Sequence, residues 1–286
     1  MAPRIGLAVL RTSAIFVFLA LAGATYQGTA TALERRRFPH PGRLITVGDR
    51  QLHIYCLGEG TPTVVLEAPA AGMSAVWGWV QPAVAATTRV CSYDRPGLGW
   101  SEAGTAPYDP SVVPDELHEL LARSGEPAPY VLAGQGLGAA FVTLFAARFA
   151  GETGGLVLLD PADPGRPAAP DATVRIVRAS PWLARAGLLR MTRALSGTTE
   201  GLPDASAGPV RSFLNRPDHL TRAARELARW DDTVRLAAAA ALAPDLPVVR
   251  IDVSGREPVA FLTDPSRAAD VTARLTALAR QIRDNR

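Results

Sequence analysis

Residues 130–141 constrain the fold more than any other part of this chain. An apolar run of strand-forming residues, YVLAG, leads into the glycine-rich sequence Gly134-Gln135-Gly136-Leu137-Gly138, and a helix-compatible segment follows. This order is typical of the nucleophile elbow, in which the pattern G-x-S-x-G holds a serine on a sharp turn between a strand and a helix. The serine position is occupied by Gly136. The sequence therefore predicts a turn that is kept without its reactive hydroxyl.

The composition favours one globular α/β domain with an insertion. The chain has 286 residues, of which 48% are hydrophobic and 20% charged, and this is enough to bury a full core. All 30 basic residues are arginine, and no motif of a nucleic-acid-binding fold accompanies them, so we expect no nucleic-acid partner. Two cysteines and four scattered histidines have no metal-ligand spacing. We expect neither a metal nor a cofactor.

The N-terminal segment, residues 1–37, predicts export or membrane anchoring. Arg4 and Arg11 precede an uncharged run over residues 12–33, and a small-residue site, Ala22-Gly23-Ala24, lies within it. This pattern fits a signal peptide. If residues 5–24 are retained instead, about 20 residues are long enough to span a bilayer. A cytoplasmic protein with an apolar arm is the remaining alternative, and the arginines on both flanks leave the orientation open.

The rest of the chain alternates short apolar runs with helical segments, which predicts a mostly parallel sheet covered by helices on both faces. The α/β core is expected over residues 38–161 and 244–286, and an all-helical cap over residues 162–243. The expected strands are 43–47, 51–57, 63–67, 89–93, a strand from 130, 155–160 and 247–253. The expected helices are 77–87, 114–124, 137–149, 181–195, 217–243 and 265–282.

Four motifs, together with this order, carry a family resemblance over roughly residues 40–286. They are 43–48 (RLITVG), 64–68 (VVLEA), 92–101 (SYDRPGLGWS) and 157–161 (VLLDP). The chain resembles the α/β-hydrolase family, in particular its bacterial, N-terminally anchored branch. The residues alone leave Cys56 and Cys91 open between a disulfide and two buried thiols. The resemblance implies that their strands are neighbours, which favours the disulfide.

The resemblance also implies a serine nucleophile, a histidine base, an acid and an oxyanion hole of backbone N–H groups. Gly136 has no side chain that attacks a carbonyl, and the amide of Gln135 is not nucleophilic. The oxyanion loop begins with Pro69, which has no N–H to donate. Ala70 and Leu137 are then the remaining candidate donors. Beside an elbow without a nucleophile, the sequence therefore leaves two alternatives for this loop: a weakened oxyanion site, or a plain loop that closes over the sheet.

The C-terminal end departs from the family pattern as well. No histidine follows the last expected strand, and Arg256 stands in a Ser-Gly-Arg sequence where the family has Ser-Gly-His. Arginine stays protonated and cannot act as a base. Residues 254–264 are too few for a further strand with its crossover helix. We therefore expect a sheet one strand short, with an exposed edge that favours oligomer formation. The acid stays unassigned among Asp245, Asp252 and Asp264.

Apolar side chains near the expected site favour a binding role. Met73, Trp77, Trp100 and Phe141 are candidate pocket residues for a small apolar ligand, although the same side chains suit core packing. Asp94 and Arg95 suit either polar handles for a ligand or a salt bridge that braces their loop, and the salt bridge is the preferred interpretation. We expect a non-catalytic protein that binds a small apolar ligand or a protein partner. The alternatives are an ester or amide hydrolase with an unorthodox nucleophile, and a decaying paralogue without a specific function.

Overall fold

The computed structural model describes residues 2–105, 107–165, 171–252 and 261–285. Seven strands in these residues form one sheet in the spatial order β1-β2-β4-β3-β5-β6-β7. β1 pairs antiparallel with β2, β2 pairs antiparallel with β4, and the other neighbours are parallel. The strands are β1 Arg43–Val47, β2 Arg50–Leu57, β3 Thr63–Glu67, β4 Val90–Tyr93, β5 Tyr130–Gln135, β6 Thr153–Leu159 and β7 Val248–Ile251. The predicted strands and the mostly parallel sheet are confirmed.

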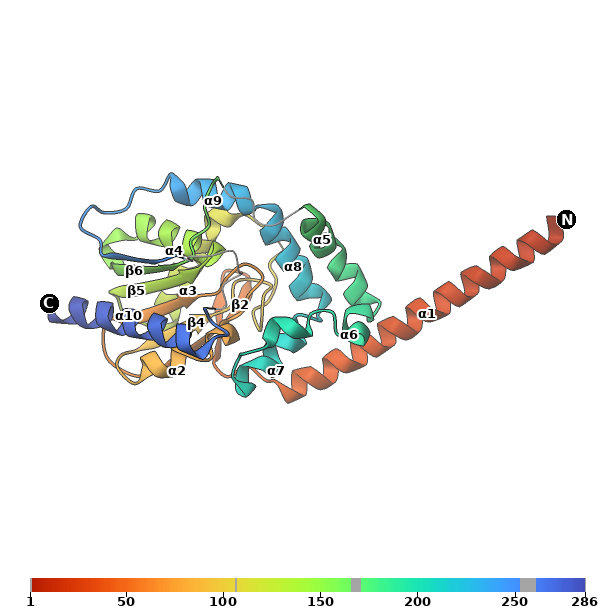
Figure 1. The fold of residues 1–286 in the computed structure, drawn as a ribbon, viewed down its shortest axis with the longest axis horizontal. Coiled ribbons are helices and arrows are strands. Elements are labelled where there is room, and N and C mark those ends of the chain that lie inside the picture. The colour runs from red at the N-terminus through yellow and green to blue at the C-terminus, as the bar shows by residue number, and fades with distance from the viewer. Residues whose placement is uncertain (1, 106, 166–170, 253–260, 286) are drawn as a thin grey trace.

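Helices cover both faces of this sheet (Figure 1). The core helices are α2 Val80–Ala85, α3 Val113–Ser124, α4 Leu137–Arg148 and α10 Pro265–Asp284. α3 and α4 share one hydrophobic cluster with the sheet, and α2 and α10 share the cluster on its other face. β3 and β4 are buried along their whole length, which explains why these central strands are mainly apolar and do not alternate between apolar and exposed polar residues.

A second group of helices lies between β6 and β7 in the chain. They are α5 Asp171–Arg185, α6 Leu188–Thr192, α7 Asp204–Phe213, α8 Pro217–Ala228 and α9 Trp230–Ala238. We call this group the helical insertion; its role as a separate cap stays a prediction. The expected helix over 181–195 is wrong at its start, because α5 begins at Asp171 and contains Pro181. Pro181 cannot donate to the carbonyl of Val177, and the Ser180 hydroxyl donates to that oxygen instead, at 2.7 Å.

Two other expected helices are each divided into two shorter elements. The expected helix over 77–87 is a 3₁₀ turn at Ser74–Trp77 followed by the short α2, in which Pro82 lies in the first turn, where a missing N–H costs least. The expected helix over 217–243 breaks at Arg229, whose φ of −110° and ψ of 18° interrupt the helical backbone between α8 and α9.

The N-terminal helix α1, Ala2–Arg37, projects away from the globular part (Figure 1). Its stretch Leu10–Arg37 is long and apolar enough to cross a membrane, and only 6% of its most apolar window is buried. A signal sequence passes the same test of length and composition. One apolar N-terminal helix with the character of a signal or a membrane span is therefore present.

The sheet ends at β7 in the described residues, and only α10 follows it. This agrees with the expected shortened edge. Arg256 lies in residues 253–260, outside the described residues, so the structure does not place this proposed remnant of the histidine position.

A disulfide joins Cys56 and Cys91, a pairing that the residues alone had left open. Cys56 on β2 lies directly opposite Cys91 on β4 in the antiparallel register, and their sulfur atoms are bonded. The bond closes a loop that holds β3 and α2, and thus fixes the antiparallel edge of the sheet to its parallel centre.

Candidate functional site

The glycine-rich stretch forms a sharp turn between a strand and a helix. β5 ends at Gln135, α4 begins at Leu137, and Gly136 between them has φ 57° and ψ −113°. A β-carbon on Gly134 would lie 2.4 Å from the carbonyl carbon of Gly138, and one on Gly138 would lie 2.6 Å from the Ala68 oxygen. Both outer glycines are therefore sterically required. The geometry of a nucleophile elbow is present in full.

The tip of this elbow has room for a side chain but carries none. A β-carbon built on Gly136 meets nothing within 4 Å among the described atoms, and the residue is half-buried. A serine there would meet only the cost of a positive φ, which the sharp turn imposes on any residue with a β-carbon. Steric crowding therefore does not exclude a serine at this position. The position has no nucleophile because glycine has no side chain.

The loop after β3, where the oxyanion donors were predicted, is bound to the helical insertion. Ala71 has φ 59°; its N–H donates to Glu226 on α8 at 3.2 Å, and its carbonyl accepts from His219 at 3.1 Å. Ala70 packs against the buried cluster that contains Leu137. The two predicted donor residues, Ala70 and Leu137, therefore belong to one hydrophobic cluster. The next residue of the loop, Ala71, is hydrogen-bonded to α8 through both of its backbone groups.

One buried arginine organises these contacts. Arg95 is 1% exposed, and all five of its N–H donors have acceptors: two oxygens of Glu226 at 2.8 and 3.0 Å, a Glu67 oxygen, and the carbonyls of Ala68 and Pro69 at 2.8 and 2.9 Å. The predicted Asp94–Arg95 salt bridge is wrong. The physical reason is that the guanidinium is saturated by two carboxylates on other elements.

The pKa values of the two carboxylates, Glu67 and Glu226, are shifted in opposite directions. Burial raises the pKa of both, but for Glu226 the charge and hydrogen bonds of Arg95 outweigh it, so the pKa of Glu226 lies below its ordinary value. For Glu67 burial dominates over Arg95, and the net pKa is raised. Burial, followed by the charge of Glu67, also raises the pKa of Tyr93, whose hydroxyl donates to Glu67. The Arg95–Glu226 pair is thus the ionised centre of the network.

Asp94 belongs to a separate buried cluster. Its carboxylate accepts from the Nδ1 of His53 at 2.9 Å and from the backbone N–H groups of Ser74 and Trp100 at 2.6 and 2.9 Å. Burial raises the pKa of Asp94, but these donors outweigh it and the net pKa is lowered. The His53–Asp94 pair has the form of a catalytic base and acid. However, the Ser74 hydroxyl lies 3.5 Å from Nδ1, the nitrogen already bound to Asp94.

None of the four histidines is available as a base at the elbow. His219 lies closest to the oxyanion loop, but its Nδ1 accepts from the Gly99 N–H and its Nε2 donates to Ala71, and burial lowers its pKa. His53 lies on β2, three strands from β5 in the sheet. His118 pairs with Glu152 on the α3 side, and His40 is exposed beside β1.

Ser101, the serine considered as an alternative nucleophile, and Asp264 have structural partners. Ser101 is buried, and its hydroxyl donates to the Asp94 carbonyl and accepts from the His53 N–H. Asp264 caps the first turn of α10, and Asp245 is exposed. Asp252 follows β7 and lines a cavity of about 320 Å³ with Asp163 and Arg250. Glu67, Glu226 and His219, which the sequence analysis did not single out, are the polar groups that shape this region.

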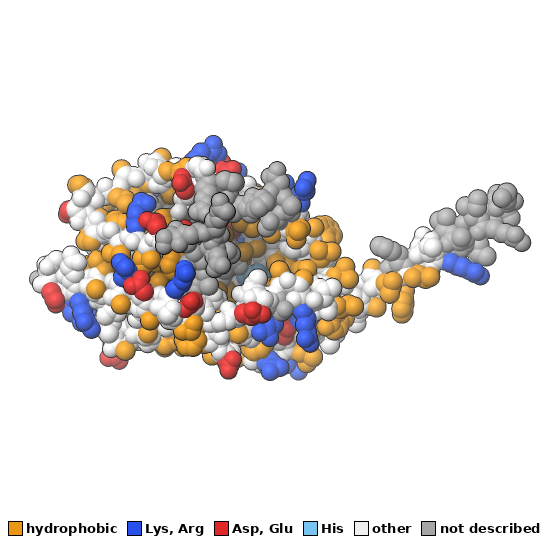
Figure 2. All heavy atoms as spheres, in the orientation of Figure 1, with side chains coloured by type: hydrophobic (Ala, Val, Ile, Leu, Met, Phe, Trp, Pro, Cys, Tyr) orange, Lys and Arg blue, Asp and Glu red, His pale blue; other side chains and the backbone are white. Residues whose placement is uncertain are grey.

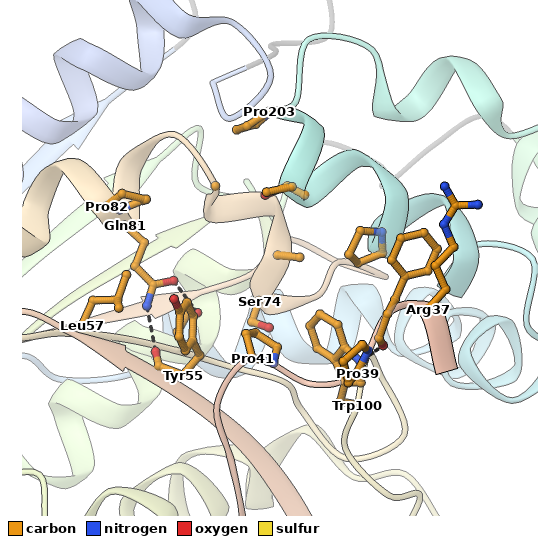
Figure 3. A pocket seen from close by; sticks show the side chains of 17 residues that line it. Arg37, Pro39, Pro41, Tyr55, Leu57, Ser74, Gln81, Pro82, Trp100 and Pro203 are labelled. Carbon is orange, nitrogen blue, oxygen red and sulfur yellow. Dashed lines mark hydrogen bonds between the residues drawn. The ribbon is translucent and has the colours of Figure 1, made fainter. Parts of the chain in front are cut away.

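A cavity of about 340 Å³ lies between β2, β4, α2 and α7 (Figure 3). Its polar wall groups largely bond to one another, since the Gln81 amide donates to the Tyr55 carbonyl and accepts from the Ser92 hydroxyl, both at 2.7 Å. Much of the remaining wall is apolar and includes Pro39, Pro41, Leu57, Trp100 and Pro203.

Of the four predicted pocket residues, Trp100 lines this cavity (Figure 3). Met73, Trp77 and Phe141 are 1%, 0% and 1% exposed and belong to three different hydrophobic clusters. For these three the structure corrects the prediction. Trp77 packs between the sheet, α2 and α10, Met73 packs against α7, and Phe141 packs between α4 and α9. Each of these positions removes a large apolar area from water.

The Glu226→Gln variant tests the role of the buried network. It removes one carboxylate from a saturated guanidinium, and breaking a buried ion pair costs about 3–5 kcal/mol of unfolding free energy. Urea unfolding of the full chain measures this loss. The matched control is Glu119→Gln, which removes an exposed i,i+4 pair with Arg123 and is expected to cost about 0.5 kcal/mol or less. Equal losses in the two variants would contradict the account.

Comparisons with known proteins agree with this architecture. An uncharacterised protein of Schizosaccharomyces pombe is 31% identical over 150 residues, which cover 42% of this chain and only 28% of that protein. An enol-lactonase from Burkholderia xenovorans matches with a TM-score of 0.59 at 18% identity, over 82% of this chain and 99% of its own.

Two further solved structures show the same similarity of fold. An esterase from Thermogutta terrifontis has a TM-score of 0.60 at 18% identity, over 82% of this chain and 97% of its own. The N-formylmaleamic acid deformylase from Pseudomonas putida has a TM-score of 0.58 at 21% identity, over 84% and 89%. The family model of the α/β hydrolase fold matches residues 62–203, from β3 through the elbow into the helical insertion. This chain belongs to the α/β-hydrolase fold family.

Proposed function

We propose that this chain is a non-catalytic α/β-hydrolase-fold protein that binds a small apolar ligand. The observation that carries the proposal is Gly136. The elbow keeps its backbone conformation, with φ 57° and ψ −113°, while the residue at its tip has no atom that can attack a carbonyl.

The state of the other catalytic parts supports the same conclusion. A histidine base contributes roughly 10²–10⁴-fold to such reactions, and each of the four histidines is held away from the elbow or has both ring nitrogens engaged. Pro69 offers no N–H to an oxyanion, and its carbonyl is bound to Arg95. A nucleophile, a base and one oxyanion donor are thus lost at separate places, and each loss alone slows acyl transfer.

The cavity of about 340 Å³ is the proposed ligand site. Its volume lies within the range of small-molecule sites, the Gln81 amide and the Ser92 hydroxyl in its wall are hydrogen-bonded to protein groups, and much of the remaining wall is apolar. Arg37 lies at its edge and is exposed, so a ligand with an acyl chain and a carboxylate fits the wall and the rim. We therefore propose a short- or medium-chain carboxylic acid as the class of ligand, in preference to a protein partner.

We also propose that α1 anchors the chain in a membrane. Residues 5–22 are about 18 in number, which is within the range that spans the hydrocarbon core. Arg11 is about 9 Å along the helix axis from residue 5, so its long side chain can extend to the nearer interface. The ligand cavity lies beside the end of α1, since Arg37 and Pro39 belong to its wall. Anchoring therefore places the cavity close to a source of acyl chains.

The loss of catalysis is tested with p-nitrophenyl butyrate and three forms of the full chain: unmodified, Gly136→Ala and Gly136→Ser. We expect all three to match the buffer rate, because no described base can deprotonate the new hydroxyl. Gly136→Ala is the matched control, since it adds a β-carbon at the same positive φ without a hydroxyl. Turnover by the unmodified chain that heat denaturation abolishes would favour the alternative, a hydrolase with an unorthodox nucleophile.

Ligand binding is tested with hexanoate and the full chain in lipid nanodiscs. A ligand at 100 times its Kd stabilises the folded state by about 2.7 kcal/mol, so the thermal midpoint rises. Ala205→Trp, at the exposed rim of the cavity, should abolish this rise, and Ala122→Trp, on the exposed side of α3, should preserve it. A low midpoint that no ligand moves would instead indicate a decaying paralogue.

A further inference from the structure

An unusual apolar and basic surface lies on α5 and α6. Its large apolar side chains are strongly exposed: Trp182 is 72% exposed, Met191 65%, Ile176 64% and Leu188 44%. Arg178 and Arg185 line one groove with Trp182 and are exposed as well, and the Arg185 guanidinium lies 5.0 Å from the centre of the Trp182 ring. We call these six residues the α5–α6 surface. Its apolar area has no covering element among the described residues.

The C-terminal part of α1 is in contact with the helical insertion near α5 and α6. A β-carbon on Gly23 would lie 2.3 Å from the Ala186 oxygen, so the two backbones are in close contact at the turn between α5 and α6. Further along, Gln27 donates to the Asn215 carbonyl at 2.7 Å, and Glu34 pairs with Arg190. The segment from Gly23 to Arg37 is therefore part of the globular unit, and only residues 2–22 extend beyond it.

The length of this extension locates a membrane boundary. Residues 5–22 of this extension rise about 27 Å along the helix axis, which matches the hydrocarbon thickness of a thin bilayer. If these residues span the membrane, the lipid headgroups begin close to Gly23, at the turn that connects α5 with α6. In Figures 1 and 2 the edge from which α1 emerges carries α5, α6 and a gathering of hydrophobic side chains.

The chemistry of the α5–α6 surface matches a headgroup layer. Tryptophan beside arginine is typical of membrane interfaces, where the ring is partly in hydrocarbon and the cation contacts phosphate. Between residues 172 and 199 the chain contains five arginines and no aspartate or glutamate. Such a segment is attracted to anionic lipids by about 1 kcal/mol for each basic residue near the surface.

We propose that the α5–α6 surface docks on the headgroups of an anionic membrane into which α1 inserts. This inference rests on the anchoring part of the proposed function. Docking would fix the tilt of the globular part against the bilayer and keep the rim of the cavity near the lipid. The occupant of the surface is thus a lipid layer and not a second protein.

Quenching of tryptophan fluorescence by brominated lipids tests the proposal. The full chain is reconstituted in vesicles of phosphatidylcholine and phosphatidylglycerol that contain phosphatidylcholine brominated near the top of its acyl chains. We expect quenching of the unmodified protein and a loss of most of that quenching in Trp182→Phe. Trp79→Phe is the matched control, because Trp79 is 39% exposed, is bound to the Gly201 carbonyl and is not part of the α5–α6 surface, so its removal should preserve the quenching.

The contribution of charge is tested in the same vesicles. Arg178→Gln with Arg185→Gln should reduce the quenching, and Arg274→Gln with Arg280→Gln on α10 should leave it unchanged. Resistance to carbonate extraction reports the anchor separately. A chain that resists extraction while Trp182 stays unquenched would overturn the docking proposal and leave the anchor standing. A chain released by carbonate would overturn the anchor, and with it the boundary on which the docking argument rests.

Discussion

The region around the elbow depends on the buried guanidinium of Arg95. It lies after β4, it binds the carbonyls of the oxyanion loop after β3, and it pairs with Glu226 on α8. An arginine in the core is tolerated only when its charge and all its donors are compensated, and here two carboxylates and two carbonyls do so. Because these partners come from residues 67–69 at the end of β3 and from Glu226 on α8, the same ion pair that permits burial also fixes the helical insertion on the sheet.

The proposed loss of catalysis is compatible with a stable fold. An enzyme of this fold holds a residue with a side chain at a positive φ on its elbow, which costs on the order of 1–3 kcal/mol. Glycine adopts the same conformation without that cost. Gly136 therefore removes strain as well as the nucleophile. Elsewhere, the loop that would supply oxyanion donors is held to α8 by both backbone groups of Ala71, which favours a rigid scaffold over a site that must open for substrate.

The sequence predicted the sheet and the elbow well, because both are set by local chemistry. A β-carbon on Gly134 would lie 2.4 Å from the backbone of Gly138, and one on Gly138 would lie 2.6 Å from the Ala68 oxygen. Any side chain larger than hydrogen at either position would therefore conflict with the turn. The strands are short apolar runs between turn residues, which is what burial on both faces demands. Helix boundaries in the insertion were less accurate, since Pro181 is accommodated by a hydroxyl of the preceding residue, a compensation that no pattern displays.

The sequence did not predict the buried polar residues Glu67 and Glu226, and the reason differs between the two. Glu67 closes a fully buried strand, and a carboxylate in that place needs a partner, so a signal was present. Glu226 resembles any acid of an amphipathic helix; its burial follows from the docking of α8, which the sequence does not specify. The pocket was misplaced for a related reason: Trp77 and Phe141 suit a cavity wall and a packed core equally, and only the tertiary arrangement distinguishes them.

The central claim is that this fold has kept its elbow and lost its nucleophile. Its most direct test is intact-mass spectrometry of the native, unmodified chain after incubation with a fluorophosphonate, which forms a covalent adduct with activated hydroxyl nucleophiles. The account predicts that the mass stays unchanged. A stoichiometric adduct on the native chain, absent after prior heat denaturation, would contradict it and would identify the modified residue as a nucleophile in place of Gly136.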